Sequence, residues 1–170
     1  TMKMTLKLPG NELLGFRAGQ YLEFIMKDGS RRAFSIASHP SEALIELHLR
    51  LIEGGKFTHF VFNEMQEKTI HRIEAPLGQF YMRESDKPII FVSGGTGFAP
   101  IKSIIEDMIQ SKNTRPIFLY QGVKGEEDLY MNEICNLWKS KYPNIKYIPI
   151  FSDPIENDNK TIRRGLVHAA

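Results

Sequence analysis

The hydrophobic pattern of the chain changes character between Pro76 and Lys87. Before this stretch, short runs have the composition and alternation of half-buried strands. They read "MTLKL", "QYLEFIM", "RRAFSIAS", "ALIELHLR" and "KTIHRIEA". After it, apolar runs of strand length alternate with segments of helical period, which is the βαβ pattern of a parallel sheet. The sequence therefore predicts an antiparallel, Greek-key type β barrel over residues 1–83 and an α/β nucleotide-binding domain over residues 84–170.

Within the first half, the strand "ALIELHLR" alternates between apolar and polar residues from Ile45 to Arg50. One of its faces should point into the core and the other toward solvent or a ligand. The inward set is Ile45, Leu47 and Leu49, and the outward set is Glu46, His48 and Arg50. One short helix is expected at "KFTHFVFNEM", with Thr58 as its N-terminal cap.

The second half contains three strand–helix units, with helices expected from about Gly97 to Ser111 and from about Glu127 to Ser140. A buried-type strand, Ile89 to Val92, precedes the first of them. The sequence stops at "RRGLVHAA", where a helix is expected to begin. Three parallel strands are few against the usual ~4 to 6. We therefore expect the C-terminal part of this domain to be missing.

Composition excludes several classes of protein. The 42% hydrophobic and 25% charged residues are those of an ordinary soluble globular chain, and no apolar run has the length of a membrane span. The net charge of +2 comes from scattered residues, so no nucleic-acid partner is expected. Cys135 is the single cysteine, and we expect it to be buried as packing. Because one cysteine cannot form a disulfide within the chain, a reducing cytoplasm is the expected location. The histidines show no metal-ligand spacing, so no metal site is predicted.

The segment "FVSGGTGFAPIKS" joins the strand of residues 89–92 to the following helix. It lies at the carboxyl end of a parallel strand, where ligands bind in such sheets. The ATP-binding pattern G-x-x-x-x-G-K-[ST] fails, because the required glycines fall on Thr96 and Ile101. Pro100 suits the first helical turn and places Lys102 inside the helix. The pattern G-x-G-x-x-G also fails, since its last position is Pro100.

Three motifs in this order resemble the ferredoxin-NADP reductase family of flavin-linked NAD(P)H oxidoreductases. The first is "RRAFSIAS", preceded by "FRAGQYLEF", in which Ala18 stands where the family usually has proline. The second is "GGKFTHF". The third is "GGTGFAPIKS", followed by "YQGVKGEEDLY". The sequence of these motifs is similar to that of reductases of the CDP-6-deoxy-glucoseen reductase type and of oxygenase-reductase components.

The resemblance implies a flavin site in the first half. Arg32 would pair with flavin phosphate, Phe34 would pack on the flavin, and the hydroxyl of Ser35 would lie near flavin N5. The "GGKFTHF" segment would supply backbone and hydroxyl donors for the pyrophosphate. The other residues implied in flavin binding are Ala33, His48, Leu49, Arg50, Gly55, Lys56, Phe57 and Thr58.

The resemblance also implies a nicotinamide site in the second half. Thr96 would lie against the nicotinamide and, with Ser35, form the catalytic pair. The remaining residues implied for this nucleotide are Gly94, Gly95, Gly97, Pro100, Gly122, Lys124 and Ser152. Asp153 would repel a 2′-phosphate, whereas Lys124 and the pair Arg163 and Arg164 could attract one. NADH is therefore slightly favoured, and NADPH stays open.

Each motif has a plainer reading when it stands alone. Arg32 beside Arg31 could be a solvated charge, Ser35 a strand hydroxyl, and Gly54–Gly55 a simple turn. His48 could equally be a surface strand residue. Three motifs in the family's order, each on the type of element it needs, favour the functional reading.

The implied function is hydride transfer from NADH or NADPH to FAD, in preference to FMN, and then electron transfer to an iron–sulfur centre or a partner protein. A [2Fe-2S] cluster would belong only to a domain outside this chain. The family's first barrel strand and its C-terminal part are missing, so this shortened chain could be inactive. Two alternatives remain: an enzyme that releases reduced free flavin, and a non-catalytic nucleotide-binding regulatory module.

Overall fold

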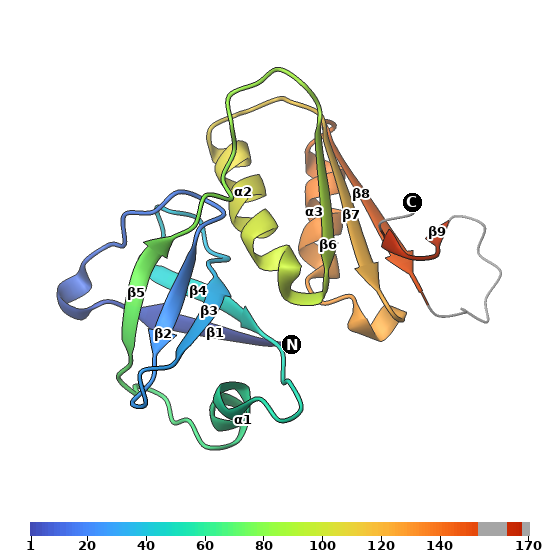
Figure 1. The fold of residues 1–170 in the computed structure, drawn as a ribbon. Coiled ribbons are helices and arrows are strands. Elements are labelled where there is room, and N and C mark those ends of the chain that lie inside the picture. The colour runs from blue at the N-terminus through green and yellow to red at the C-terminus, as the bar shows by residue number, and fades with distance from the viewer. Residues whose placement is uncertain (153–162, 168–170) are drawn as a thin grey trace. The chain divides into compact units, whose positions relative to one another are not determined.

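The computed structural model describes residues 1–152 and 163–167, without the side chains of Asn11, Arg163 and Arg164. By their contacts these residues form two compact units (Figure 1). The barrel unit comprises Thr1–Met82 together with Ala99–Gln110, and the parallel-sheet unit comprises Arg83–Phe98 together with the described residues from Ser111 onward.

Two antiparallel sheets build the barrel unit. The strands are β1 (Met2–Lys7), β2 (Tyr21–Ile25), β3 (Arg31–Ser35), β4 (Leu44–Leu49) and β5 (Arg72–Leu77). β1 pairs with β4, while β2 lies between β3 and β5. A bridge between Ile36 and Leu47 joins the end of β3 to β4. The predicted antiparallel strands are thus confirmed, and each falls on a run of alternating sequence.

The strands of the barrel unit and helix α1 (Lys56–Asn63) share a core cluster of apolar side chains. Burying each large apolar side chain stabilises the fold by about 1.5–3 kcal/mol. The buried members are Leu22, Phe24, Ile36, Ile45, Leu47, Leu49, Phe57 and Val61. The inward face predicted for β4 is therefore correct.

The prediction for the opposite face of β4 needs correction. Glu46 and His48 were expected to face solvent or a ligand, yet they are only 9% and 4% exposed. The reason is helix α2 (Phe98–Gln110), whose Lys102 lies 3.3 Å from a carboxylate oxygen of Glu46. Only Arg50, just beyond the strand, is exposed as predicted. Period-two alternation separated the two faces correctly but could not show that both are covered.

In the sheet of the parallel-sheet unit, the strands lie side by side in the order in which they occur in the sequence. These are β6 (Ile89–Gly94), β7 (Ile117–Val123), β8 (Ile145–Phe151) and β9 (Arg163–Arg164), all parallel. The predicted parallel sheet is confirmed. Its fourth strand, β9, was not predicted, because two residues are too few to show a period. β9 consists of the two arginines that open "RRGLVHAA", where the sequence predicts the start of a helix.

The second predicted helix of this unit begins later than expected. A short 3-10 turn occupies Glu126–Asp128, and helix α3 runs from Asn132 to Lys141. Met131 adopts a left-handed conformation, with φ of 63°, which interrupts the helix expected from about Glu127. Cys135 of α3 is fully buried as predicted, and its burial raises the pKa of the thiol to about 12.

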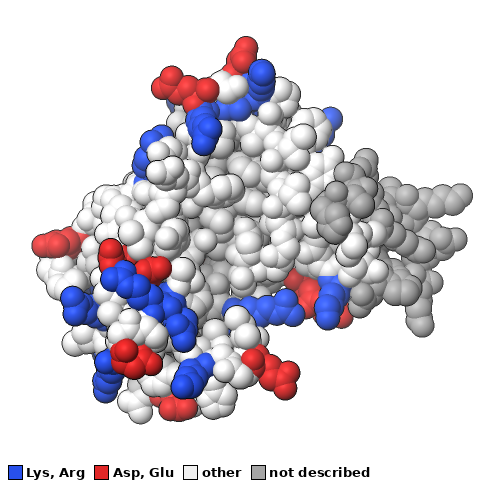
Figure 2. Space-filling model, viewed as in Figure 1, with Lys and Arg blue, Asp and Glu red and all other residues white. Residues whose placement is uncertain are grey.

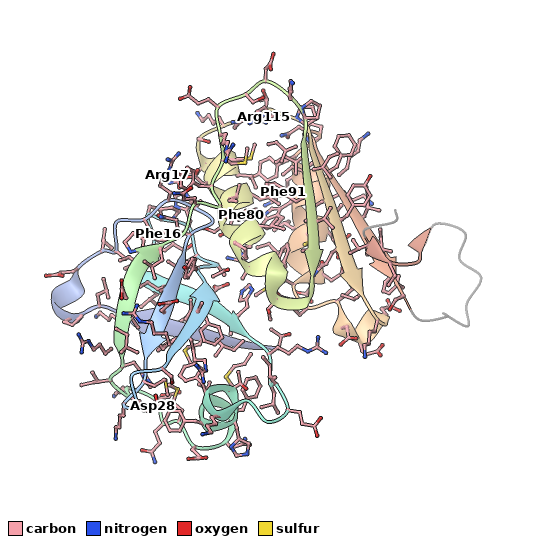
Figure 3. The ribbon with its side chains drawn as sticks, viewed as in Figure 1. Phe16, Arg17, Asp28, Phe80, Phe91 and Arg115 are labelled. Atoms are coloured by element: carbon pink, nitrogen blue, oxygen red, sulfur yellow. The ribbon has the colours of Figure 1, made fainter. Side chains whose placement is uncertain are left out.

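Strand β6 is covered on one face among the described residues. Ile89 and Phe91 are buried, and Figure 3 labels Phe91 on this strand, whereas Ile90 and Val92 are 68% and 51% exposed. The apolar run of residues 89–92 predicts a strand buried on both faces, which is wrong for the residues that the structure describes. An unbroken apolar run indicates that both faces can be buried, but it does not supply the covering element.

The segment that leads from β5 to β6 is attached to the parallel-sheet unit by one side chain. The guanidinium of Arg115, labelled in Figure 3, donates to the carbonyl oxygens of Lys87 at 2.8 Å and Arg83 at 3.3 Å. These two bonds fix the chain before it enters β6.

The surface carries charges of both signs. On the face drawn in Figure 2, basic and acidic side chains are interspersed and form no continuous stripe of one sign. Among the helices that the structure describes, none combines the length and apolar character needed to cross a bilayer.

Candidate functional site

The two adjacent arginines of β3 have different surroundings. Arg31 donates to a carboxylate oxygen of Glu23 at 2.9 Å and forms an ion pair with Glu74. These two carboxylates raise the pKa of Arg31. The guanidinium of Arg32 instead donates to the carbonyl of Arg31 at 2.7 Å. Among the described residues, no carboxylate lies within ion-pair distance of Arg32, which leaves most of its donors for an anionic ligand.

Phe34 and Ser35 end strand β3, and both are half-buried. The ring of Phe34 lies 5.4 Å from that of Phe57 and 5.8 Å from that of Phe24, measured between centroids. These contacts fix the ring at the edge of the core. The part left exposed could flank a flat ligand, and the neighbouring hydroxyl of Ser35 could bond its polar edge.

Helix α1 presents backbone donors at its start. Gly55 is the N-cap residue, so the prediction that Thr58 caps the helix is wrong. The hydroxyl of Thr58 donates to the carbonyl of Gly55 at 3.1 Å and accepts from the amide of Ile52 at 3.2 Å. A Cβ at Gly55 would come within 2.7 Å of this hydroxyl. Thr58 thus holds the loop before the helix, and first-turn amides with exposed Lys56 remain for an anion.

The three predicted site residues on and after β4 differ in accessibility. His48 is buried, with its Nε2 atom 2.8 Å from Glu46 Oε1. Leu49 is fully buried in the core cluster. Arg50 alone presents an exposed side chain. In the structure, His48 and Leu49 serve the packing of the barrel unit, and a ligand could reach them only through the backbone.

The residues available in the barrel unit fit the chemistry of a flavin nucleotide. Such a ligand has a flat apolar ring with a polar edge and an anionic tail. Phe34 and Ser35 suit the ring, while Arg32, Lys56 and the first-turn amides of α1 suit the tail. Among the described residues, the guanidinium of Arg32 has no carboxylate within ion-pair distance, whereas that of Arg31 has two, and this difference is the observation that carries the fit.

The glycine-rich loop after β6 exposes bare backbone. A Cβ added at Gly97 would meet no atom within 4 Å, and one at Gly94 would meet only the carbonyl oxygen of Gly122, at 4.0 Å. Gly95 has a φ of 49° in the 3-10 turn, and Thr96 beside it is half-buried. The open space over Gly94 and Gly97 allows a nucleotide to approach the backbone.

Gly94 and Gly122 lie opposite each other at the carboxyl ends of β6 and β7. A Cβ at Gly122 would lie 2.6 Å from the side chain of Val167. The side chain of Val167, and not a nucleotide, therefore occupies the space next to Gly122. Sequence analysis missed this contact, since nothing in a single sequence pairs a valine near its end with a distant glycine.

The predicted adenosine-side residues follow β7 and β8. The amide of Ser152 donates to the carbonyl of Val123 at 3.0 Å, which holds the two strand ends together. Lys124 and Ser152 are exposed. Asp153, on which the preference for NADH depended, lies outside the described residues, as do the side chains of Arg163 and Arg164.

Pro100 and Lys102 lie in the first turns of α2, as the sequence predicted. The ammonium of Lys102 donates to the carbonyl of Ala37 at 3.2 Å and to Glu106 at 3.0 Å, and its side chain is 7% exposed. Lys102 is thus not a phosphate ligand. The i, i+4 spacing to Glu106 was visible in the sequence, but its partners on other elements were not.

Two sequence families match consecutive parts of the chain. Residues 1–81 match the oxidoreductase FAD-binding domain, and residues 91–170 match the oxidoreductase NAD-binding domain.

Curated relatives extend these matches over nearly the whole chain. Protein RfbI of Salmonella typhimurium is 44% identical over 170 residues, which are 98% of this chain and 50% of that protein. A Yersinia pestis protein named CDP-6-deoxy-L-threo-D-glycero-4-hexulose-3-dehydrase reductase is 39% identical over 168 residues, with the same shares covered. The chain thus spans about half the length of the curated relatives it matches.

Solved structures agree. The cytochrome P450 reductase GcoB of Amycolatopsis superposes with a TM-score of 0.86 at 30% identity, covering 96% of this chain and 50% of that one. A ferredoxin NADP+ reductase from Neisseria gonorrhoeae with bound FAD and NADP gives a TM-score of 0.77 at 20% identity and covers 96% and 65%, which shows a shared fold. The chain thus consists of an oxidoreductase FAD-binding domain followed by an oxidoreductase NAD-binding domain, and it has the fold of ferredoxin-NADP+ reductases.

Proposed function

We propose that this chain is the FAD- and NAD(P)H-binding part of a reductase that passes a hydride from NAD(P)H to FAD and then electrons to an iron–sulfur centre or a partner protein. The observation that carries the proposal is the presence, in one chain, of a matched FAD-binding half and a matched NAD-binding half. Two observations support a nucleotide site in each half: among the described residues no carboxylate lies within ion-pair distance of Arg32, and the space over Gly97 is open.

The residues of the barrel unit would bind and orient FAD. Arg32 and Lys56 would hold the anionic tail together with the first-turn amides of α1. Phe34 would flank the ring, and the hydroxyl of Ser35 would bond its reactive edge. Bound FAD supplies a ring that accepts two electrons together and releases them singly or as a pair.

The residues of the parallel-sheet unit would bind NAD(P)H. Gly94, Gly95 and Gly97 would let the pyrophosphate approach the backbone, and Thr96 would orient the nicotinamide. Lys124 and Ser152 would line the adenosine end. We keep NADH as the slightly favoured nucleotide and a cytoplasmic location as predictions.

The acceptor is proposed from the printed names of relatives. One relative is named a dehydrase reductase, and others are named phenol hydroxylase P5 protein and reductase component of terephthalate 1,2-dioxygenase. The similarity to these reductase components supports the proposal that this chain also passes electrons to an acceptor protein. A [2Fe-2S] cluster, if used, would be held by a segment outside these 170 residues.

The test separates flavin binding from flavin reduction. Purified chain is titrated with FAD and, in parallel, with FMN, and the visible spectrum and flavin fluorescence are followed. We expect FAD to bind more tightly than FMN, because only FAD carries the pyrophosphate and adenosine tail. NADH or NADPH is then added without oxygen, and bleaching of the flavin band measures hydride transfer.

The outcomes distinguish the three functional classes. A chain that binds neither flavin contradicts the proposal. Retention of FAD through gel filtration argues against an enzyme that releases free flavin. Binding of FAD and of NADH without bleaching, observed in the full-length protein, would instead favour a regulatory module.

A further inference from the structure

A buried cluster of charged groups lies where α2 meets β4 inside the barrel unit. It consists of Lys102, Glu106, Glu46 and His48, and we call it the Lys102 cluster. Their side chains are 7%, 21%, 12% and 1% exposed, in that order. Neither nucleotide site described above uses these side chains, and His48 could contribute to the flavin site only through its backbone. Burying charges costs free energy unless they are well paired, so the contacts of this cluster determine what it does.

The ammonium of Lys102 is fully engaged. It has three N–H donors, and three acceptors lie near its Nζ atom. These are Glu106 Oε2 at 3.0 Å, the carbonyl of Ala37 at 3.2 Å and Glu46 Oε1 at 3.3 Å. A hydrogen bond from His48 contributes most to lowering the pKa of Glu46 to about 2, whereas burial raises the pKa of Glu106.

The backbone that Lys102 holds follows directly on the flavin strand. Ala37 is two residues beyond Ser35, and its amide donates to the carbonyl of Glu46 at 2.7 Å. Its carbonyl accepts from Lys102, so both polar backbone groups of Ala37 are bonded.

The next residue is fixed in the same way. The carbonyl of Ser38 accepts from the hydroxyl of Ser103 at 2.7 Å, and its own hydroxyl accepts from the amide of Glu46 at 3.1 Å. Two consecutive side chains of α2 therefore bind two consecutive carbonyls after β3. An apolar residue at position 102 could dock the helix, but it could not hold a carbonyl.

We propose that Lys102 is a positioning residue for the flavin strand: by bonding the Ala37 carbonyl, with its charge balanced by Glu46 and Glu106, it holds the end of β3 so that Ser35 and Phe34 meet the flavin ring in one orientation. This inference rests on the proposed function, because it takes β3 as the flavin strand. It assigns a role in orientation to a lysine that touches no ligand.

The experiment uses the full chain and four variants. Lys102→Met removes the charge at nearly constant length. Lys102→Met with Glu106→Gln also removes the carboxylate left behind, which protects the fold. Ser103→Ala removes the second carbonyl bond. Lys139→Met, at an exposed lysine of α3, is the matched control.

Three measurements are made on each variant. Amide hydrogen exchange of residues 35–38 is measured without any ligand, FAD affinity by titration, and the visible spectrum of bound flavin as a report on its surroundings. Loss of a hydrogen bond to a charged group changes an equilibrium constant by roughly ten- to hundredfold. We expect about tenfold faster exchange and about tenfold weaker FAD binding in both Lys102 variants, a shifted flavin spectrum, a smaller change in Ser103→Ala, and wild-type values in Lys139→Met.

Two results would overturn the inference alone. One is a folded double variant with wild-type exchange at residues 35–38. The other is faster exchange with unchanged FAD affinity and spectrum, because Lys102 would then only stabilise the fold. A wild-type chain that binds no flavin would contradict the proposed function, and with it the inference, so the two failures are distinguishable.

Discussion

Arg31 and Arg32 show how adjacent residues of one type acquire different roles. Strand geometry points them to opposite faces, and the face of Arg31 carries Glu23 and Glu74 from neighbouring strands. Arg32 meets no such carboxylate among the described residues. The resemblance implies that Arg32 pairs with the flavin phosphate, and this difference in surroundings supports that prediction.

Replacing Arg32 with glutamine should weaken FAD binding by roughly ten- to hundredfold, the value of one or more charge-assisted hydrogen bonds. The melting temperature should stay near that of the wild type. Arg31→Gln is the matched control: it breaks exposed ion pairs, which contribute little to stability, and should leave FAD affinity unchanged. Fluorescence titration measures both, and equal losses in the two variants would contradict the assignment.

Two glycines make a second pair with opposite expectations. Gly97→Ala adds a Cβ into open space, so the fold should keep its stability while NADH binding weakens at least several-fold through a clash with the nucleotide. Gly19→Ala would place its Cβ 1.9 Å from the carbonyl oxygen of Phe80 at a φ of 100°. It should destabilise the fold by on the order of 2 kcal/mol or more.

Urea unfolding and NADH titration of these two variants separate stability from binding. If Gly97→Ala bound NADH as tightly as the wild type, the bare loop would not be the nucleotide site.

At the scale of elements, β4 is the strand whose environment differs most from expectation. Its polar face is covered by α2, and the pKa of Glu46 on this face is lowered to about 2, chiefly by a hydrogen bond from His48 and further by the charge of Lys102. Because the folded-state pKa of Glu46 is lowered from 4.5 to about 2, the charged carboxylate stabilises the folded chain. That contribution is fully present above pH ~4.5 and is lost as pH falls toward about 2.

Glu46→Gln should therefore be less stable than the wild type at neutral pH, and the difference should shrink as pH falls from about 4.5 to about 2. Glu106 gives the opposite sign, because burial raises its pKa. Its contribution is present at low pH and is lost as pH rises through its folded-state pKa, so Glu106→Gln should gain on the wild type as pH rises. Urea midpoints measured between pH ~4.5 and about 2 test the sign for Glu46→Gln, and midpoints measured as the pH rises above ~4.5 test the sign for Glu106→Gln. A constant difference for Glu46→Gln would contradict the expected pKa of Glu46.

At the scale of the whole molecule, helix α2 decides how the chain divides. Sequence order places it in the predicted domain of residues 84–170, a boundary that stays a prediction. Its contacts group residues Ala99–Gln110 with the barrel strands. Those contacts include Lys102 with Ala37 and Glu46, and Ser103 with Ser38.

Cavity variants in each core can test to which unit α2 belongs. Leu47 and Leu119 are both fully buried, one in β4 and one in β7. Leucine-to-alanine changes at such sites cost about 2–5 kcal/mol. Leu47→Ala should speed amide exchange in α2 together with the barrel strands, whereas Leu119→Ala should speed exchange in β6 to β8 and spare α2. Faster exchange of α2 in Leu119→Ala alone would place the helix with the parallel sheet.

The sequence by itself determined strands β1 to β8, the change to βαβ alternation and the class of flavin- and nicotinamide-dependent oxidoreductase, because periods of two and 3.6 and the short motifs are local properties. Only the tertiary structure decided the burial of Glu46 and His48, the pairing of Arg31 but not Arg32, the approach of Val167 to Gly122 and the partners of Lys102. Each of these depends on residues far apart in the chain. A single sequence carries the period of each element, but the contacts between elements arise only when the chain folds.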